Sequence, residues 1–306
     1  MFAYTFRRLL ITIPTLLVVI AVVYILLFSA PGGPFDSERV VPEAIQAQLM
    51  SKYHLDQPYW RQYLLYVGQL LQGDLGVSYR YADWSVNELV GSALPVSLAI
   101  GGIAIALSLL LGVLLGALAA LYRNSLVDYL VMALGSLGSV VPSFVLGPLL
   151  VLAFAISLQW LPSGGWDHFS WPFMVLPVAL LTLINVSTLA RIMRASMVEV
   201  MNSHYIRTAR AKGLPMRLIV FRHALRPSLL PVVTIVGPLA VSSITAALVT
   251  ESIFSIPGLG ILVVNGAANR DYTLVLGLVV LITSLVVLIN LCVDLIYAFL
   301  DPRSRT

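Results

Sequence analysis

The sequence predicts an all-α integral membrane protein with six transmembrane helices. Hydrophobic residues make up 59% of the 306 residues and charged residues only 10%, whereas soluble domains carry roughly 25% charged residues. An apolar run of about 18 or more residues is long enough to cross a bilayer. The runs that qualify cover residues 9–30, 94–121, 129–158, 172–190, 228–250 and 273–293.

The first run is predicted to be an uncleaved span rather than a signal peptide. Arg7 and Arg8 precede an apolar stretch of 22 residues that runs from Leu9 to Ala30. The apolar core of a cleavable signal peptide is shorter, about 7–15 residues.

Basic residues are unequally divided between the two sides that six spans define. Thirteen fall on one side and five on the other. The thirteen are Arg7, Arg8, Arg123, Arg303, Arg305 and the eight Lys and Arg residues between 191 and 227. Because cytoplasmic loops carry the excess of Lys and Arg, the sequence predicts that both termini and the segment 191–227 face the cytoplasm.

Residues 31–93 form the longest segment on the outer side. Two short helices are predicted in it, from Pro42 to about His54 and from Pro58 to Gln72, with Gly73 ending the second. The second helix carries Tyr59, Trp60, Tyr63 and Tyr66, which are typical of the membrane interface. The segment is either a cap packed on the outer mouth or a landing surface for an external protein, and both readings stay open.

The middle spans contain residues that permit close packing and helix breaks. Gly112 and Gly116 have the spacing that lets two helices approach closely. Prolines and glycines interrupt the third and fifth spans. They are Pro142, Gly147 and Pro148 in the third, and Pro231, Gly237 and Pro238 in the fifth. Such breaks are tolerated only where neighbours or water satisfy the freed backbone groups, so they mark either static kinks or spans that bend as a pore opens.

Ionisable residues are nearly absent from the apolar runs, which argues against a proton- or sodium-driven carrier. Glu251 lies at the outer end of the fifth span and Asp294 near the inner end of the sixth. Hydroxyl side chains of the fifth span either line a weakly selective polar path or make helix-packing contacts. They are Ser242, Ser243, Thr245 and Thr250.

The basic segment 191–227 is predicted to form two short helices with a break at Gly213. Apolar residues at helical spacing give the first helix one apolar face. They are Met197, Val200, Met201, Tyr205 and Ala209. Pro215 suits the first position of the second helix, to which Ile219, Phe221 and Leu225 supply apolar contacts. The segment is either a solvated loop that only sets topology or a docking element for a soluble partner.

The stretch RTARAKG within this segment resembles the EAA-type motif of permease subunits of ATP-binding-cassette importers. Gly213 matches the motif's glycine, and Pro227 follows at roughly the family's distance. The chain departs from the motif at Arg207, where many members carry Glu. The resemblance implies a coupling helix that binds an ATPase subunit. The residues it assigns are Arg207, Thr208, Ala209, Arg210, Ala211, Lys212 and Gly213.

Residues 251–272 resemble the signature of the peptide-importing branch, and KYHLDQP at 52–58 and GDLGVS at 73–78 do so as well. Asn269, Arg270 and Asp271 match that signature. Pro257 and the nearby glycines predict a tight turning segment, for which we hypothesise a role at the outer gate. The path and gate residues expected on these grounds are Ser242, Ser243, Thr245, Glu251, Pro257, Gly258, Arg270 and Asp271.

The sequence lacks the motifs of a self-sufficient enzyme or ATPase. No lysine stands in the Gly-Lys-Ser/Thr setting that cradles phosphates, the histidines show no HExxH spacing, and Cys292 is the single cysteine. We therefore expect no cofactor or metal in this chain and no nucleic-acid partner. A channel or secondary carrier that works alone is the competing class.

The resemblance is to the B-type permease of oligopeptide importers and covers essentially the whole chain. It implies a six-span type I importer fold with a short periplasmic insertion after the first span, in the inner membrane. The expected partners are a second, similar permease subunit, two ATPases that bind ATP and Mg, and a periplasmic peptide-binding protein. The expected regions are 1–93 (first span and periplasmic segment), 94–300 (core, with the coupling loop at 191–227) and 301–306 (cytoplasmic tail).

Overall fold

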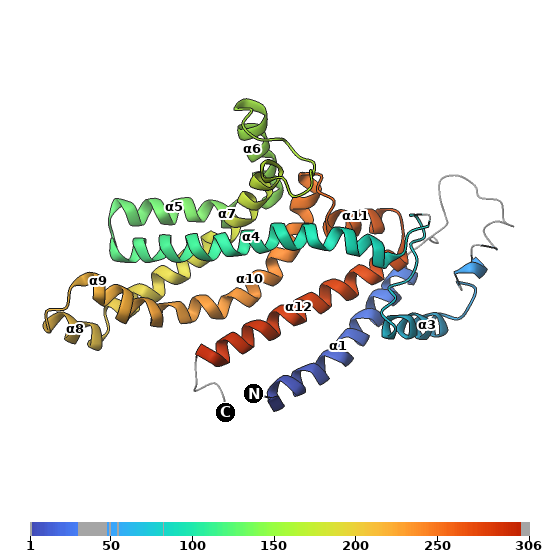
Figure 1. Cartoon of the computed structure of the whole chain (residues 1–306), viewed down its shortest axis with the longest axis horizontal. Coiled ribbons are helices and arrows are strands. Elements are labelled where there is room, and N and C mark those ends of the chain that lie inside the picture. The colour runs from blue at the N-terminus through green and yellow to red at the C-terminus, as the bar shows by residue number, and fades with distance from the viewer. Residues whose placement is uncertain (1, 30–47, 49, 54, 82, 301–306) are drawn as a thin grey trace. The chain divides into compact units, whose positions relative to one another are not determined.

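The computed structural model describes residues 2–29, 48, 50–53, 55–81 and 83–300, and these are predominantly helical (Figure 1). Among them, the pairing of Val77 with Ser85 is an isolated bridge, and no strand is formed in these residues, so the all-α class is confirmed. The predicted helix from Pro42 to His54 lies mostly outside the described residues. The helices are α1 (Phe2–Ser29), α3 (Tyr59–Leu71), α4 (Val86–Leu121), α5 (Leu126–Val140), α6 (Ser143–Leu150), α7 (Trp171–Met201), α8 (His204–Ala211), α9 (Met216–Leu218), α10 (Leu225–Ile253), α11 (Leu259–Ala268) and α12 (Tyr272–Leu300), with π-helical segments η1 (Val151–Ser157) and η2 (Ile219–Ala224).

Four helical stretches of the described residues are long and apolar enough to cross a membrane, and a bent pair of helices can supply a fifth span. The four are Val86–Leu121, Trp171–Met201, Met216–Ile253 and Tyr272–Val293. The predicted first span coincides with α1, in which Ile13–Ser29 is a shorter apolar helix.

The third predicted span, 129–158, is not one straight helix. Helix α5 ends at Val140, and the chain turns by 110° into α6 and η1. Pro142 stands at the start of α6 with an extended backbone, at φ −59° and ψ 145°, and a proline also disfavours helical geometry in the residue before it. The proline break predicted here is thus a sharp bend.

The fifth predicted span, in contrast, is one continuous helix. Helix α10 is continuous from Leu225 to Ile253, with Pro231 and Pro238 inside it. The prediction that these prolines interrupt the span is therefore wrong. The irregular geometry lies earlier, in the π-helical segment η2 that joins α9 to α10.

The chain forms two compact units. The first comprises residues 1–95 and 257–288, and the second comprises residues 96–256 and 289–306. The first unit therefore takes in α11 and most of α12 as well as the N-terminal part of the chain.

In the second unit, glycines bring α4 and α5 against α7. A Cβ atom built on Gly112 would lie 2.5 Å from Leu189 Cβ, and one on Gly116 would lie 2.5 Å from the carbonyl oxygen of Ala190. The close approach predicted from the Gly112 and Gly116 spacing is thus present, with α7 as the neighbour.

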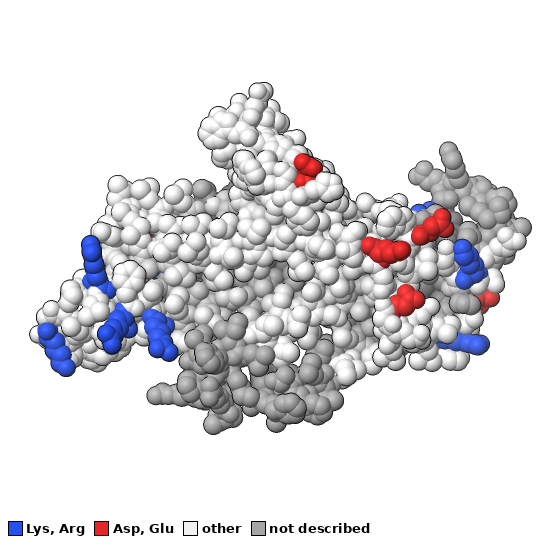
Figure 2. Space-filling model, in the orientation of Figure 1, with Lys and Arg blue, Asp and Glu red and all other residues white. Residues whose placement is uncertain are grey.

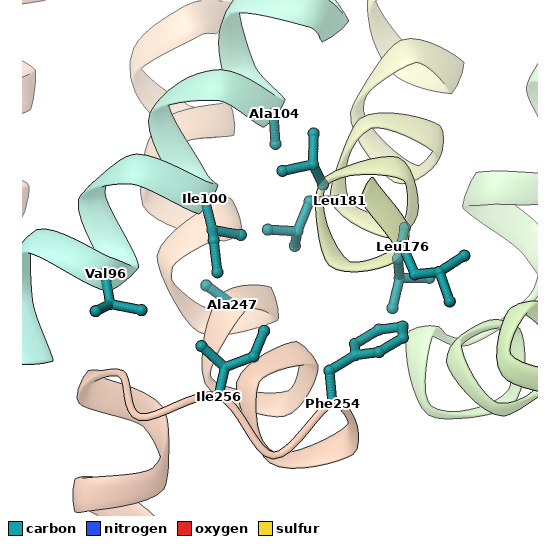
Figure 3. Close-up of a cluster of buried hydrophobic side chains, with 10 residues drawn as sticks. Val96, Ile100, Ala104, Leu176, Leu181, Ala247, Phe254 and Ile256 are labelled. Atoms are coloured by element: carbon teal, nitrogen blue, oxygen red, sulfur yellow. The ribbon is translucent and has the colours of Figure 1, made fainter. Parts of the chain in front are cut away.

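One core of this unit joins three helices and one loop. Side chains from α4, α7, α10 and the loop after α10 point into it (Figure 3). Ile100, Phe254 and Ile256 are almost completely buried there. The loop that follows α10 is therefore part of this core.

The first unit is built around α1, α3, α11 and the adjacent ends of α4 and α12. One cluster joins Val86 and Leu89 of α4 to Leu274 and Leu278 of α12. Another joins Ile20 and Tyr24 of α1 to Tyr66 of α3 and Leu276 of α12. These clusters pack α3 and α11 against the long apolar helices of their own unit.

Candidate coupling surface and translocation face

The predicted helix stop at Gly213 is confirmed by the end of α8. Gly213 has φ +74°, its N–H donates to the carbonyl of Arg210 at 2.9 Å, and the N–H of Leu214 donates to the carbonyl of Ala209 at 3.3 Å. This pair of bonds is a Schellman motif, in which glycine takes the left-handed position. No atom lies within 4 Å of a Cβ built on Gly213, so the residue faces open space.

The segment that we call the coupling surface is the exposed side of residues 204–222. Its cations are exposed: Arg207, Arg210, Lys212, Arg217 and Arg222. The sequence contains no acidic residue between Glu199 and Glu251, and Figure 2 shows the Lys and Arg side chains gathered over α8 and α9 without acidic neighbours in that view. Thr208, Ala211 and Gly213 are also exposed here, so the surface is cationic with small residues between the charges.

The helix break that precedes α8 differs from the prediction. Helix α7 continues past the predicted span end at 190 to Met201, and Ser203 caps a new helix that begins at His204. The apolar face predicted to run from Met197 to Ala209 is therefore divided. Tyr205, expected on that face, is 48% exposed, whereas Ile206 is fully buried.

The second helix of the basic segment also differs in detail. Pro215 is the cap before α9 rather than its first residue. Ile219 is buried as predicted, but Phe221 is 72% exposed. The coupling surface therefore carries exposed Tyr205, Met216 and Phe221 among its cations, and aromatic residues, Met and Arg are the types enriched in protein interfaces.

The coupling surface is fastened to the transmembrane bundle by one hydrophobic cluster. Ile206 and Ala209 of α8 pack with Met193 and Met197 of α7 and Ile219 of η2. Ala209 is thus buried, in contrast to the other assigned small residues. The surface is a packed extension of α7, not a free loop.

An ion pair that the sequence analysis did not find ties α5 to α7. The guanidinium of Arg194 donates to both carboxylate oxygens of Asp128, at 2.5 and 2.6 Å, and Asp128 is buried. The backbone N–H of Asn124 donates to the same carboxylate at 2.9 Å. Asp128 is the one acid between Glu88 and Asp167 in the sequence, which was the available clue to a specific role.

The hydroxyl residues of α10 divide between two faces. Ser242 and Thr245 are exposed. Ser243 is buried and accepts a hydrogen bond from Asn185 Nδ2 of α7 at 2.8 Å, and Thr250 is buried and donates to the carbonyl of Ala246 at 2.8 Å. Of the four, Ser242 and Thr245 are the ones that lie on the exposed side of α10.

The residues expected at the outer gate are placed in different environments. Glu251 is buried in the second unit and accepts a hydrogen bond from the Ser97 hydroxyl at 2.5 Å. In the first unit, Pro257 and Arg270 are exposed and Gly258 is buried. Arg270 has φ +56°, which is uncommon for a residue other than glycine.

Asp271 is a fully buried hydrogen-bond acceptor in the first unit. Its carboxylate accepts from the Ser78 hydroxyl, from the backbone N–H of Tyr79 at 3.1 Å and from that of Leu274 at 3.2 Å. It therefore caps the start of α12 and holds the loop at 78–79, of which Ser78 is the last residue of the GDLGVS stretch. The sequence assigned Asp271 to the gate, and the structure shows it joining two signature segments.

Comparison with known proteins agrees with these features. The family model described as binding-protein-dependent transport system inner membrane component matches residues 112–306. The chain is 51% identical over 305 residues to the oligopeptide transport system permease protein OppB of Haemophilus influenzae, with 100% of both chains covered. It is 50% identical to the OppB of Escherichia coli K12, again with 100% of both chains covered. It is 40% identical to the dipeptide transport system permease protein DppB of Bacillus subtilis, with 99% of this chain and 97% of that one covered.

The fold also resembles a solved transporter structure. A chain of the inward-facing MetNI methionine ABC transporter matches with a TM-score of 0.60 and 19% identity, over 70% of this chain and 96% of that chain. At this identity the match supports the fold alone.

Proposed function

The chain belongs to the family of binding-protein-dependent transport system inner membrane components, and on that premise we propose how it works within a peptide importer. It is the membrane permease subunit of an ATP-driven peptide importer, not an enzyme, and ATP hydrolysis resides in a separate subunit. The observation that carries the coupling proposal is the cationic, packed surface at residues 204–222. Such a surface fits a groove of an ATPase subunit with acidic groups.

We infer that the chain needs partners on both sides of the membrane. A second, similar permease subunit completes the pathway, two ATPases bind ATP and Mg on the cytoplasmic side, and a peptide-binding protein delivers substrate from outside. The excess of basic residues at 191–227 supports a cytoplasmic location for the coupling surface and both termini. This chain itself holds no cofactor in the proposal.

The proposed mechanism is alternating access. Closure of the ATPase pair draws the coupling surfaces of the two permease subunits together, and the outer side of the pathway opens to take peptide from the binding protein. Because α8 is packed on α7 through Ile206 and Met197, a displacement of α8 is transmitted to the transmembrane helices.

A reconstitution experiment tests the function. We expect the chain, purified with co-expressed ATPases and second permease, to transport an oligopeptide into proteoliposomes only when the binding protein is outside and ATP is present on the side of the ATPases. Removal of ATP is expected to reduce uptake to the background of empty vesicles. Uptake of the same peptide by the chain alone, without ATP, would identify a self-sufficient channel or carrier instead.

A second experiment tests the translocation face of α10. In a Cys292→Ser background, we expect Ser242→Cys and Thr245→Cys to react with a membrane-impermeant maleimide about tenfold faster than Ser243→Cys, because thiols react where water allows the thiolate to form. Ser243 is the matched control because it lies on the same helix but is buried against Asn185. Equal labelling of all three positions would contradict the assignment of a path along this face.

A further inference from the structure

Helix α3 in the first unit exposes several large apolar side chains and buries a polar one. Gln62 is buried, whereas Trp60, Leu64 and Leu71 are 64%, 57% and 86% exposed. A surface helix of a soluble domain buries its apolar stripe and exposes its polar residues. Exposed apolar side chains gathered on one helix mark a contact with a membrane or another protein.

The buried face of α3 is fixed to the transmembrane helix α1. The Gln62 side chain accepts a hydrogen bond from Tyr24 Oη at 2.7 Å and donates to the carbonyls of Leu55 and Gln57 at 3.2 and 2.7 Å. Tyr63 Oη donates to the carbonyl of Leu17 in α1 at 3.1 Å. Helix α3 therefore lies against a helix whose own exposed side is apolar, including Val18, Val22 and Ile25.

A cavity of about 280 Å³ lies beside α3 within the same unit. Aromatic side chains dominate its lining: Tyr24, Phe28, Tyr53, Tyr66, Tyr79 and Tyr272. Lys52 and Asp74, which carry opposite charges, also line it and are exposed. Leu65 belongs both to the cavity and to the exposed side of α3, because it lines the cavity and is itself 44% exposed.

One buried polar atom at this cavity has no partner among the described residues. Tyr66 is 7% exposed, and its hydroxyl is buried without a hydrogen bond to them. The other polar residue of the buried α3 face, Gln62, makes the three bonds described above. The hydroxyl oxygen has less than 1 Å² of accessible surface, so a ligand reaches it only when the Tyr66 side chain turns toward the cavity. Because an unsatisfied buried hydroxyl is costly, an acceptor brought by a ligand would stabilise that arrangement.

We propose that the cavity and the exposed face of α3 form one binding site for a phospholipid with an ammonium headgroup. The ammonium is held by the aromatic side chains, as cations bind over aromatic rings, and by Asp74. The phosphate accepts from Lys52 and from the Tyr66 hydroxyl, and the acyl chains follow the apolar face that carries Leu65 and Leu64. The volume is near the lower end for ligand pockets and fits a headgroup rather than a whole lipid.

Several features distinguish a lipid from a docked protein as the occupant. The exposed face of α3 carries Tyr59 and Trp60, which favour the membrane interface, and its single charged residue is Arg61. Helix α3 packs on α1, whose exposed side is apolar and which the sequence predicts to cross the bilayer. With the orientation proposed above, this lipid site lies in the outer leaflet. Lipid binding itself does not depend on transport.

The first test measures lipid retained by the chain when it is purified with its partner subunits. We expect native mass spectrometry to show bound phosphatidylethanolamine, and Tyr66→Phe to reduce its occupancy about tenfold through loss of a hydrogen bond to a charged group. Tyr63→Phe is the matched control, because it removes a hydroxyl from the same helix that bonds to Leu17 and does not line the cavity. Equal occupancy in the wild type and Tyr66→Phe, or equal loss in both variants, would overturn the site.

Further measurements with other lipids and with a soluble headgroup identify the ligand. Retention of phosphatidylglycerol as strong as that of phosphatidylethanolamine would overturn the role of the ammonium group, and displacement of all bound lipid by soluble glycerophosphoethanolamine would overturn the role of the acyl chains. In vesicles of brominated phosphatidylethanolamine, we expect less fluorescence quenching in Trp60→Phe than in the wild type. Identical quenching would place α3 outside the lipid and would favour a protein partner on this face.

Discussion

Replacing Gly213 by aspartate is expected to reduce ATP-dependent peptide uptake about tenfold or more, because a carboxylate facing an acidic partner costs several kcal/mol. The chain itself has room for the new side chain, since nothing lies within 4 Å of the Cβ position. The left-handed backbone at φ +74° adds a local strain of about 1–2 kcal/mol, which leaves insertion intact. Uptake into proteoliposomes and co-purification of the ATPase subunit are the measurements.

Two control variants separate the charge from the strain. Gly213→Asn has nearly the same shape without the charge, and asparagine tolerates the left-handed region, so it should retain most of the uptake. Gly73→Asp places the same residue at a similar open position, with φ +78° and no neighbour within 4 Å, outside the coupling surface. If Gly213→Asp transports like the wild type, or if Gly73→Asp fails equally, residues 204–222 do not couple transport to an ATPase.

Gly138→Ala is expected to destabilise the protein by about 3 kcal/mol, toward the upper end of the usual cost of overpacking. A Cβ at this position would lie 2.1 Å from the carbonyl oxygen of Leu183 and 2.7 Å from its carbon. These are backbone atoms of α7, so α5 and α7 must separate to admit one methyl group. The measurement is the temperature at which purified protein loses its monodisperse form in detergent.

Gly135, one turn earlier in α5, provides the matched control. The nearest atom to a Cβ built there is Ser187 Cα at 3.9 Å, an ordinary contact distance. Gly135→Ala should therefore be neutral or slightly stabilising, because alanine favours the helix over glycine by roughly 0.5–1 kcal/mol. Equal stability of the two variants would show that α5 does not pack on α7 as described.

Local chemistry made several features of the structure predictable. The glycine stop of α8 follows from the need for a left-handed residue, and the Gly112 and Gly116 contacts follow from the absence of a side chain. The bend before α6 follows from Pro142. Each of these depends on a single residue and its immediate neighbours, which the sequence displays directly.

The incorrect predictions of buried residues in the basic segment, at Tyr205 and Phe221, arose from counting residues along one uninterrupted helix face. The break at Asn202 and Ser203 restarts the helix, so the spacing counted from Met197 no longer applies at Tyr205. Phe221 follows Ile219 by two positions, and residues two apart do not share a helix face, so only Ile219 faces the core. Periodicity predicts a face only while one helix continues.

Contacts between distant parts of the chain were also beyond prediction. Arg194 and Asp128 are 66 positions apart, and Ser78 and Asp271 are 193 positions apart. Asp271 was singled out from a signature, but its role in joining two segments requires knowledge of which loops meet. For α10, the sequence identified the hydroxyl residues, and only the helix orientation separates exposed Thr245 from buried Ser243.

The clamp between Arg194 and Asp128 has a mechanical consequence. Because it joins the start of α5 to α7, and the Ile206 and Met197 cluster joins α8 and η2 to α7, we expect these helices to move as one rigid body when the coupling surface is displaced. We expect the deformation to be taken up at the 110° bend between α5 and α6, before Pro142. That bend is then the hinge of this unit.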